Sequence, residues 1–214
     1  MHKKLYGLHC IEHPLIKDKT VQLRQITTSS KRFRELIYEI TLLLGFEATK
    51  DLILKTCELK TPLETFQASC LSDSNHPVIV PILRAGLGML DAMLTLLPYA
   101  EVGHIGMSRN EQNLQAEQYY FKMPVYPAGS RVYVCDPMLA TGGSAISAIN
   151  QIKKYQKADI VFICILAAPE GVKHFFAEHP DVPIITACLD RQLNNKGYIL
   201  PGLGDAGDRL FGTL

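Results

Sequence analysis

Residues 132–144, VYVCDPMLATGGS, contain the pattern around which the fold of this chain is predicted. The β-branched and apolar run 132–135 is typical of a buried strand, and it stops at an aspartate-proline pair. Apolar residues at helical spacing follow over 145–155, which predicts a helix with Ser144 as its N-cap. Strand, loop and helix in this order indicate an α/β protein.

The loop between this strand and this helix has the features of a phosphate-binding site. Gly142 and Gly143 lie beside the hydroxyl residues Thr141 and Ser144 at a predicted helix N-terminus, where free backbone N–H groups meet the positive end of the helix dipole. Asp136 precedes the loop at the carboxyl end of a strand, where open α/β sheets bind ligands. A tight turn without a ligand is the alternative. A Walker A loop and the dinucleotide fingerprint are excluded by the absent lysine and the glycine spacing.

A second unit of the same kind is predicted at 77–97. The continuous apolar run 77–83 is typical of a buried parallel strand, and apolar residues at helical spacing follow from residue 87. Arg84 lies between them, and its guanidinium offers a fork of donors suited to a diphosphate. The alternative is a solvent-exposed arginine at a helix start.

The polar segment 108–118, SRNEQNLQAEQ, follows a strand predicted at 102–107 and has no apolar periodicity. A loop of this kind beside a site is a candidate lid, with Arg109 as its anion-binding residue. Further strands are predicted at 119–123, 160–166 and 182–187, and a β-hairpin is predicted around residues 61–62. A helix is predicted from Ser30, its expected cap, to Gly45, its expected stop, with a second short helix over 48–54.

Several segments resemble the uracil phosphoribosyltransferases, a branch of the type I phosphoribosyltransferases. In the wider group two acids end the strand before the phosphate loop, and Cys135 stands at the first of these positions here, as in the uracil enzymes. The matching segments are SSKRFREL (29–36), FEATKDL (46–52), PILRAGLGML (81–90), SRNE (108–111), DPMLATGGS (136–144), AAPEG (167–171) and YILPGLGDAGDRLFGT (198–213).

The resemblance and the element order imply an α/β fold with a parallel central sheet and helices on both faces. One domain is expected over 1–214. It would comprise an N-terminal arm with helices and a hairpin over about 1–70, a core with the site for phosphoribosyl pyrophosphate (PRPP) over about 77–187, and an irregular but ordered uracil-binding hood over about 188–214.

The resemblance further implies that uracil and PRPP give UMP and diphosphate in pyrimidine salvage. Asp136, Asp205 and Arg109 are expected to be catalytic, with three roles open for Asp205: contact with PRPP, with a metal-bound water or with the N1 proton of uracil. Backbone of Ile199, Gly204 and Ala206, together with Asp205, is expected to bind uracil. The residues expected to bind PRPP are Arg84, Arg109, Asp136, Pro137, Met138, Leu139, Ala140, Thr141, Gly142, Gly143, Ser144 and Asp205.

The family also implies Mg²⁺ as a cofactor held through PRPP and water without direct protein ligands, GTP as an allosteric effector in some members, and a homodimer or homotetramer. Charge is balanced, with 22 Lys and Arg against 21 Asp and Glu, so nucleic acid is not an expected partner. A PRPP-sensing RNA-binding regulator is the main alternative, and a catalytically silent relative that binds uracil or UMP is another.

The remaining features indicate a cytoplasmic enzyme with no membrane contact. No secretion signal and no apolar run of membrane-spanning length is evident. The cysteines form no C-x-x-C pair and are expected to be reduced thiols; they are Cys10, Cys57, Cys70, Cys135, Cys164 and Cys188.

Overall fold

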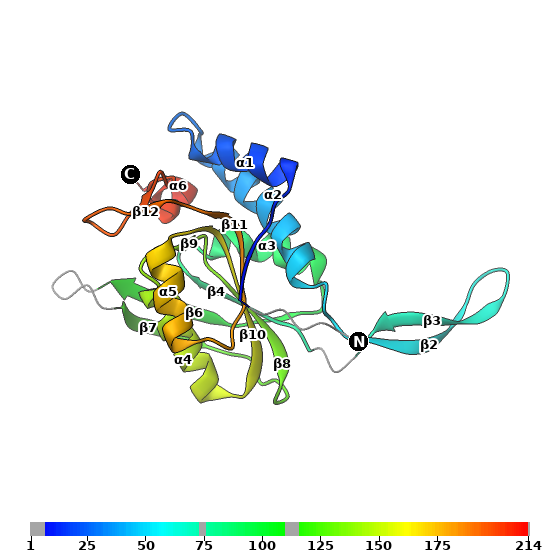
Figure 1. Cartoon of the computed structure of the whole chain (residues 1–214). Helices are drawn as coiled ribbons and strands as arrows, with labels where there is room; N and C mark the ends of the chain where they lie inside the picture. Colours follow the sequence, from blue (N-terminus) through cyan, green and yellow to red (C-terminus); the bar gives the residue numbers. More distant parts are fainter. Residues whose placement is uncertain (1–6, 73–75, 110–115, 214) are drawn as a thin grey trace.

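A computed structural model describes residues 7–72, 76–109 and 116–213, with the side chains of residues 109 and 116 left undescribed (Figure 1). Its centre is one large sheet with the order β1-β11-β10-β8-β4-β6-β7, in which β5 pairs with β4 and β9 with β10. The strands are parallel except for the last pair, β6 and β7. Their bounds are β1 Leu8–Cys10, β4 Val78–Leu83, β5 Glu101–Val102, β6 His104–Arg109, β7 Ala116–Lys122, β8 Ser130–Cys135, β9 Met138–Leu139, β10 Ala158–Ala167 and β11 Ile184–Leu189.

Helices cover both faces of the sheet, which confirms the predicted fold class. Ile79 and Tyr133 are register partners on β4 and β8, and they pack into one core with α1, α2 and α3. The next pair, Val80 and Val134, packs into the other core with α4 and α5. Because side chains alternate between the two faces, a strand buried on both is apolar throughout. The helices are α1 Pro14–Arg24, α2 Ser30–Ala48, α3 Leu87–Leu96, α4 Gly143–Tyr155 and α5 Pro169–Glu178.

The helix predicted from residue 30 differs from α2 at both ends. Ser29, not Ser30, is the N-cap, and its side chain accepts a hydrogen bond from the backbone N–H of Arg32. Gly45 does not end the helix. A Cβ at Gly45 would lie 2.7 Å from Leu96 Cδ1 and 2.8 Å from Met93 Sδ, so this glycine allows α2 and α3 to pack closely.

The short helix predicted over 48–54 is wrong, whereas the hairpin after it is confirmed. The chain turns after α2, with the N–H of Leu52 donating to Thr49 O, and β2 (Leu54–Lys60) begins directly. Asp51 is buried in this turn against the guanidinium of Arg131, a tertiary contact that local spacing does not reveal. β2 and β3 (Thr65–Leu71) form a separate two-stranded sheet that projects from the body (Figure 1).

The C-terminal segment is ordered, as predicted, although it contains more regular structure than its sequence suggested. β12 (Gln192–Leu193) and β13 (Ile199–Leu200) pair as a small hairpin, and α6 (Ala206–Phe211) packs against α2. Figure 1 shows this segment beside the N-terminal helices. All six cysteines are free thiols. Among the described residues, no helix combines the length and apolarity that crossing a membrane requires.

Candidate active site

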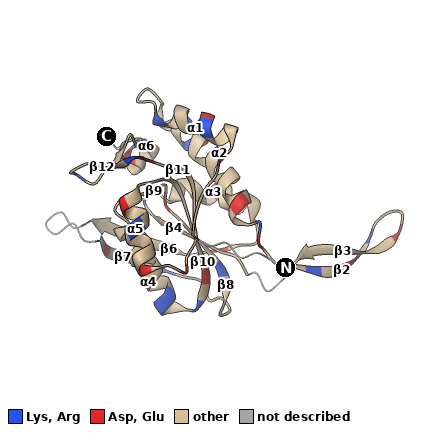
Figure 2. Ribbon diagram, viewed as in Figure 1, with Lys and Arg blue, Asp and Glu red and all other residues tan. Residues whose placement is uncertain are grey.

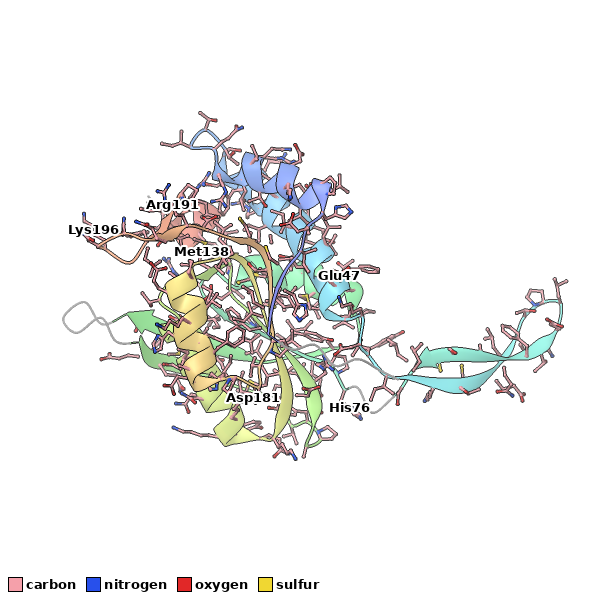
Figure 3. The ribbon with its side chains drawn as sticks, in the orientation of Figure 1. Glu47, His76, Met138, Asp181, Arg191 and Lys196 are labelled. Atoms are coloured by element: carbon pink, nitrogen blue, oxygen red, sulfur yellow. The ribbon has the colours of Figure 1, made fainter. Side chains whose placement is uncertain are left out.

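A cavity of about 300 Å³ opens at the carboxyl ends of the central strands. Parallel strands place these ends at one edge of the sheet, so residues distant in sequence meet there. In Figure 3, Met138 lies at the edge nearest the C-terminal segment, on which Arg191 and Lys196 are labelled. The lining residues are Ile82, Leu83, Arg84, Ala85, Met107, Asp136, Met138, Ser144, Asp205, Ala206 and Gly207.

Asp136 lies half-buried in this cavity, just after β8. Its backbone N–H donates to Ile163 O at 3.1 Å, which fixes the turn to the neighbouring strand β10. Burial raises the pKa of the carboxyl to about 7, the Asp205 carboxylate also raises it, and a hydrogen bond from the Met138 backbone N–H lowers it. The carboxylate form is therefore poorly stabilised without a ligand, and a positive charge arriving in the cavity would stabilise it.

The predicted phosphate loop follows Asp136, but its helix cap differs from the prediction. Gly142, not Ser144, is the N-cap of α4, and it has the left-handed conformation with φ +86° that favours glycine. A glycine cap has no side chain to accept the first helical N–H groups. Within the described chain, the backbone N–H groups of residues 141–144 donate to no acceptor. Together with the helix dipole they form an anion-binding site.

Arg84 occupies the turn between β4 and α3, beside this loop. Its side chain is 59% exposed, and its Nη2 atom lies 3.5 Å from Asp208 Oδ1, so most of its donors are available to a ligand. Gly86 allows the two turns to touch, because a Cβ there would lie 2.4 Å from Cys135 O. The turn after β4 therefore rests directly on the end of β8.

The hood residues expected to bind uracil fall into two groups. Asp205 and Ala206 line the cavity, and the Asp205 carboxylate caps α6 by accepting the Asp208 N–H at 2.9 Å. Ile199 is buried in β13, and Gly204 is exposed with φ +83°; neither lines the cavity. The structure thus brings the Asp205 carboxylate to the cavity beside the phosphate loop, and it leaves Ile199 and Gly204 outside the cavity wall.

The role of Arg109 in a lid falls outside the described residues. Its backbone ends β6 and pairs with Ala116 at the start of β7, so the segment does connect two antiparallel strands. The side chain of Arg109 and residues 110–115 are not described.

Sequence reasoning missed Met107, Gly207 and His174, which shape the site. Met107 and Gly207 line the cavity, and a Cβ at Gly207 would lie 3.3 Å from Asp205 Oδ1. From α5, Gly171 and His174 contact the back of the phosphate loop. The sequence indicated that Ala167, Pro169 and Gly171 could line the cleft, with a simple tight turn as the alternative, and nothing in its spacing placed His174 there.

The donors at this cavity suit a magnesium ion that arrives with a phosphate-bearing substrate. No three His, Cys, Asp or Glu side chains gather into a metal site in the part of the chain that is described. Asp136 and Asp205 both line the cavity and offer carboxylate oxygens. Mg²⁺ keeps several waters and is bound by one or two carboxylates plus substrate phosphates, which matches this donor set.

Comparison with solved structures identifies the class of fold. A hypoxanthine-guanine phosphoribosyltransferase from Bacillus anthracis has a TM-score of 0.51 at 12% identity, with 75% of this chain and 80% of that chain covered. The fold is therefore that of the type I phosphoribosyltransferases. A solved structure of a protein from Aquifex aeolicus is closer, with a TM-score of 0.90 at 39% identity and coverage of 95% and 97%.

Sequence comparison then identifies the family. The family model for uracil phosphoribosyltransferase matches residues 10–213. Uracil phosphoribosyltransferases from Legionella pneumophila (strain Lens) and Variovorax paradoxus (strain S110) are 52% and 49% identical to this chain over 203 and 207 residues. These matches cover 95% and 97% of this chain, and 94% and 99% of the relatives. The chain belongs to the uracil phosphoribosyltransferase family.

Proposed function

We propose that this protein transfers the phosphoribosyl group of PRPP to N1 of uracil, releasing UMP and diphosphate in pyrimidine salvage. The observation that carries the proposal is the set of free backbone N–H groups at 141–144, which shares one cavity edge with Arg84, Asp136 and Asp205. One phosphate site, one diphosphate site and one sugar site are what PRPP requires. Membership of the uracil phosphoribosyltransferase family supports uracil as the base that accepts the phosphoribosyl group.

Each part of PRPP is assigned to a group of the protein. The 5-phosphate binds the N–H groups of the loop that runs from Leu139 to Ser144, following Asp136, Pro137 and Met138. The diphosphate binds Arg84 and Arg109. Asp136 contacts the ribose hydroxyls. Mg²⁺, when bound with PRPP, neutralises charge on the leaving diphosphate.

The reaction needs positioning and charge stabilisation more than covalent help from the protein. The anomeric carbon loses diphosphate through a transition state with oxocarbenium character, and N1 of uracil attacks it. The Asp136 carboxylate places negative charge close to this developing cation. Backbone of Ile199, Gly204 and Ala206 presents hydrogen-bonding groups to the base. Asp205 lies at the junction of the two substrates, which suits each of the three roles expected of it.

The assignment is tested by incubating the protein with labelled uracil, PRPP and Mg²⁺ and separating the products. We expect labelled UMP and an equal amount of diphosphate. Binding of uracil or UMP without turnover would instead identify a silent relative. A gel shift with pyrimidine leader RNA tests the regulator alternative. We expect no shift, because charge is balanced and basic and acidic residues are interspersed in the view of Figure 2.

The projecting hairpin supports a homodimer or homotetramer. A two-stranded hairpin is marginally stable alone in water. Leu63, at its tip, is 95% exposed, and Leu54, Leu59, Phe66 and Leu71 on its strands are exposed as well. A second copy of the chain would cover these residues. The resemblance alone supports GTP as an effector and a cytoplasmic location. A sizing column, with steady-state assays run with and without GTP, tests these proposals.

A further inference from the structure

α5 packs against the phosphate loop on the side of the loop's carbonyl groups. A Cβ at Gly171 would lie 2.1 Å from Ala140 O, so the helix backbone approaches this carbonyl directly. In the next turn of α5, His174 Nδ1 lies 2.9 Å from Thr141 O. Two successive carbonyls of the loop therefore face α5.

This arrangement determines where the N–H groups of the loop point. Because Thr141 O is an acceptor, the hydrogen of the contact is on Nδ1 of His174. The two peptide bonds involved are trans, and in a planar trans peptide the N–H points opposite to the C=O. The N–H groups of Thr141 and Gly142 are consequently directed away from α5.

The backbone alone does not fix this orientation. Gly142 has φ +86°, and glycine adopts positive and negative φ about equally well, so the peptide between Thr141 and Gly142 can rotate at low cost. The hydrogen bond from His174 favours one of the two orientations, the one that leaves the Gly142 N–H available to an anion. A binding group that is already ordered in the free protein increases affinity, because no conformational entropy is lost in ordering it when the ligand binds.

We propose that His174 is a positioning residue for the 5-phosphate, acting through the Thr141 carbonyl to aim the Gly142 N–H at the phosphate. The proposal rests on the proposed function, in which the loop binds that phosphate. It predicts that His174 affects ligands with a ribose 5-phosphate group and leaves other ligands unaffected. His174 is exposed and belongs to neither apolar core, so its replacement leaves the packing of α5 intact.

The test compares His174→Ala with His174→Asn, whose side-chain amide can donate from nearly the same place as Nδ1. Ribose 5-phosphate binding is measured by calorimetry without turnover, along with KM for PRPP and the inhibition constant of UMP. In the alanine variant we expect the dissociation constant of ribose 5-phosphate, KM for PRPP and the inhibition constant of UMP each to rise by about 10-fold, the range of one hydrogen bond. The asparagine variant should restore most of the loss. KM for uracil at saturating PRPP and inhibition by diphosphate should change less than about two-fold.

Glu178→Gln, an exposed change in the last turn of the same helix, serves as the matched control and should leave every constant unchanged. Equal ribose 5-phosphate affinity in wild type and His174→Ala would overturn the inference and leave the transferase assignment standing. A uniform weakening of uracil, diphosphate and phosphoribosyl ligands, or a loss that asparagine does not restore, would also overturn it. If the wild-type protein binds neither ribose 5-phosphate nor UMP, the proposed function fails with it.

Discussion

Asp136 combines a position in the cavity wall with a half-buried carboxyl group, and this combination makes stability depend on pH. The pKa of Asp136 in the folded protein is about 7, above its ordinary value of 3.8, so the folded state binds the proton more tightly than the unfolded state. The stability that comes from the protonated form is present below pH 4 and is lost as pH rises through 7.

Asp136→Asn should therefore be more stable than wild type at pH 8 and about equally stable at pH 4. We expect a difference of about 2 kcal/mol at pH 8, allowing for partial exposure to the cavity. Urea unfolding of both proteins at the two pH values measures it. A difference that does not change with pH would mean that Asp136 titrates normally.

The same substitution tests catalysis. With its fold intact, Asp136→Asn should lose about 100-fold in kcat, because the substitution removes the charge that we propose faces the developing cation. Steady-state assays at saturating uracil and PRPP measure the loss. Turnover close to that of wild type would remove Asp136 from the catalytic group.

Arg84 offers a separate test, because its guanidinium is largely free of protein partners. Arg84→Ala should raise KM for PRPP by about 10-fold or more and change KM for uracil little, since in the proposed function its guanidinium binds only the diphosphate. Initial rates with each substrate varied in turn give both constants. Equal effects on the two would show that Arg84 supports the fold of the site.

At the scale of elements, the contact between α5 and the phosphate loop has no room for a side chain at residue 171. Gly171→Ala would place a Cβ 2.1 Å from Ala140 O, so the loop or the helix must move. We expect a loss of about 1–3 kcal/mol in unfolding free energy, as for other overpacked sites, with weaker PRPP binding. Thermal unfolding and KM measurements beside Lys173→Ala, an exposed neighbour, test this. An unchanged KM for PRPP would show that the loop tolerates the movement.

The elements that could be predicted from sequence are those whose burial appears in their own residues. The strands at 78–83 and 130–135 and the helices after them were evident, because both faces of each strand are apolar and the helices repeat at 3.6 residues. The same strand ends predicted Asp136 and Arg84 at the cavity. Gly45 was misread because a glycine that lets two helices approach looks like a helix stop.

Other features depend on contacts between distant residues, and no local pattern encodes them. The three residues of β1 complete the sheet edge beside β11, although their sequence alone suggested an extended arm. From the sequence, Asp51 was predicted to lie in a short helix; in the structure it lies in a turn and pairs with Arg131, 80 residues away in sequence. Ser144 was the expected cap of α4, but the cap is Gly142, in a left-handed conformation that a serine at that position would adopt only with strain.

Across the whole molecule, the N-terminal helices hold the C-terminal segment, which we propose forms the uracil side of the cavity. Arg24, at the end of α1, donates to Asp190 Oδ2 and to Gly202 O, both at 2.8 Å. The same Asp190 oxygen accepts the Gly202 N–H at 3.0 Å. Arg209 donates to Gln25 O and Leu203 O, and its guanidinium lies 4.4 Å from the centre of the Phe33 ring.

Arg24→Gln should therefore impair uracil binding more than PRPP binding. We expect a rise of about 10-fold in KM for uracil, and a loss of about 3 kcal/mol in unfolding free energy because Asp190 stays buried without its partner. Lys17→Gln, a change on the same helix that breaks an exposed ion pair with Glu12 just before the helix, should change both the uracil KM and the unfolding free energy little. If uracil and PRPP constants rose together, the contact would support the whole site and not one substrate.

The hydrogen bonds of Arg24 with Asp190 and Gly202, and that of Arg209 with Gln25, join positions that lie 166 to 184 residues apart along the chain. Loops of that length close slowly relative to local structure, so the segment should dock after the central sheet has formed. During synthesis, α1 leaves the ribosome long before its partners exist. The side of the cavity that we propose binds the nucleobase is thus assembled last, and a chain released a few dozen residues early would have the phosphate loop without the residues 205–207 that line this side.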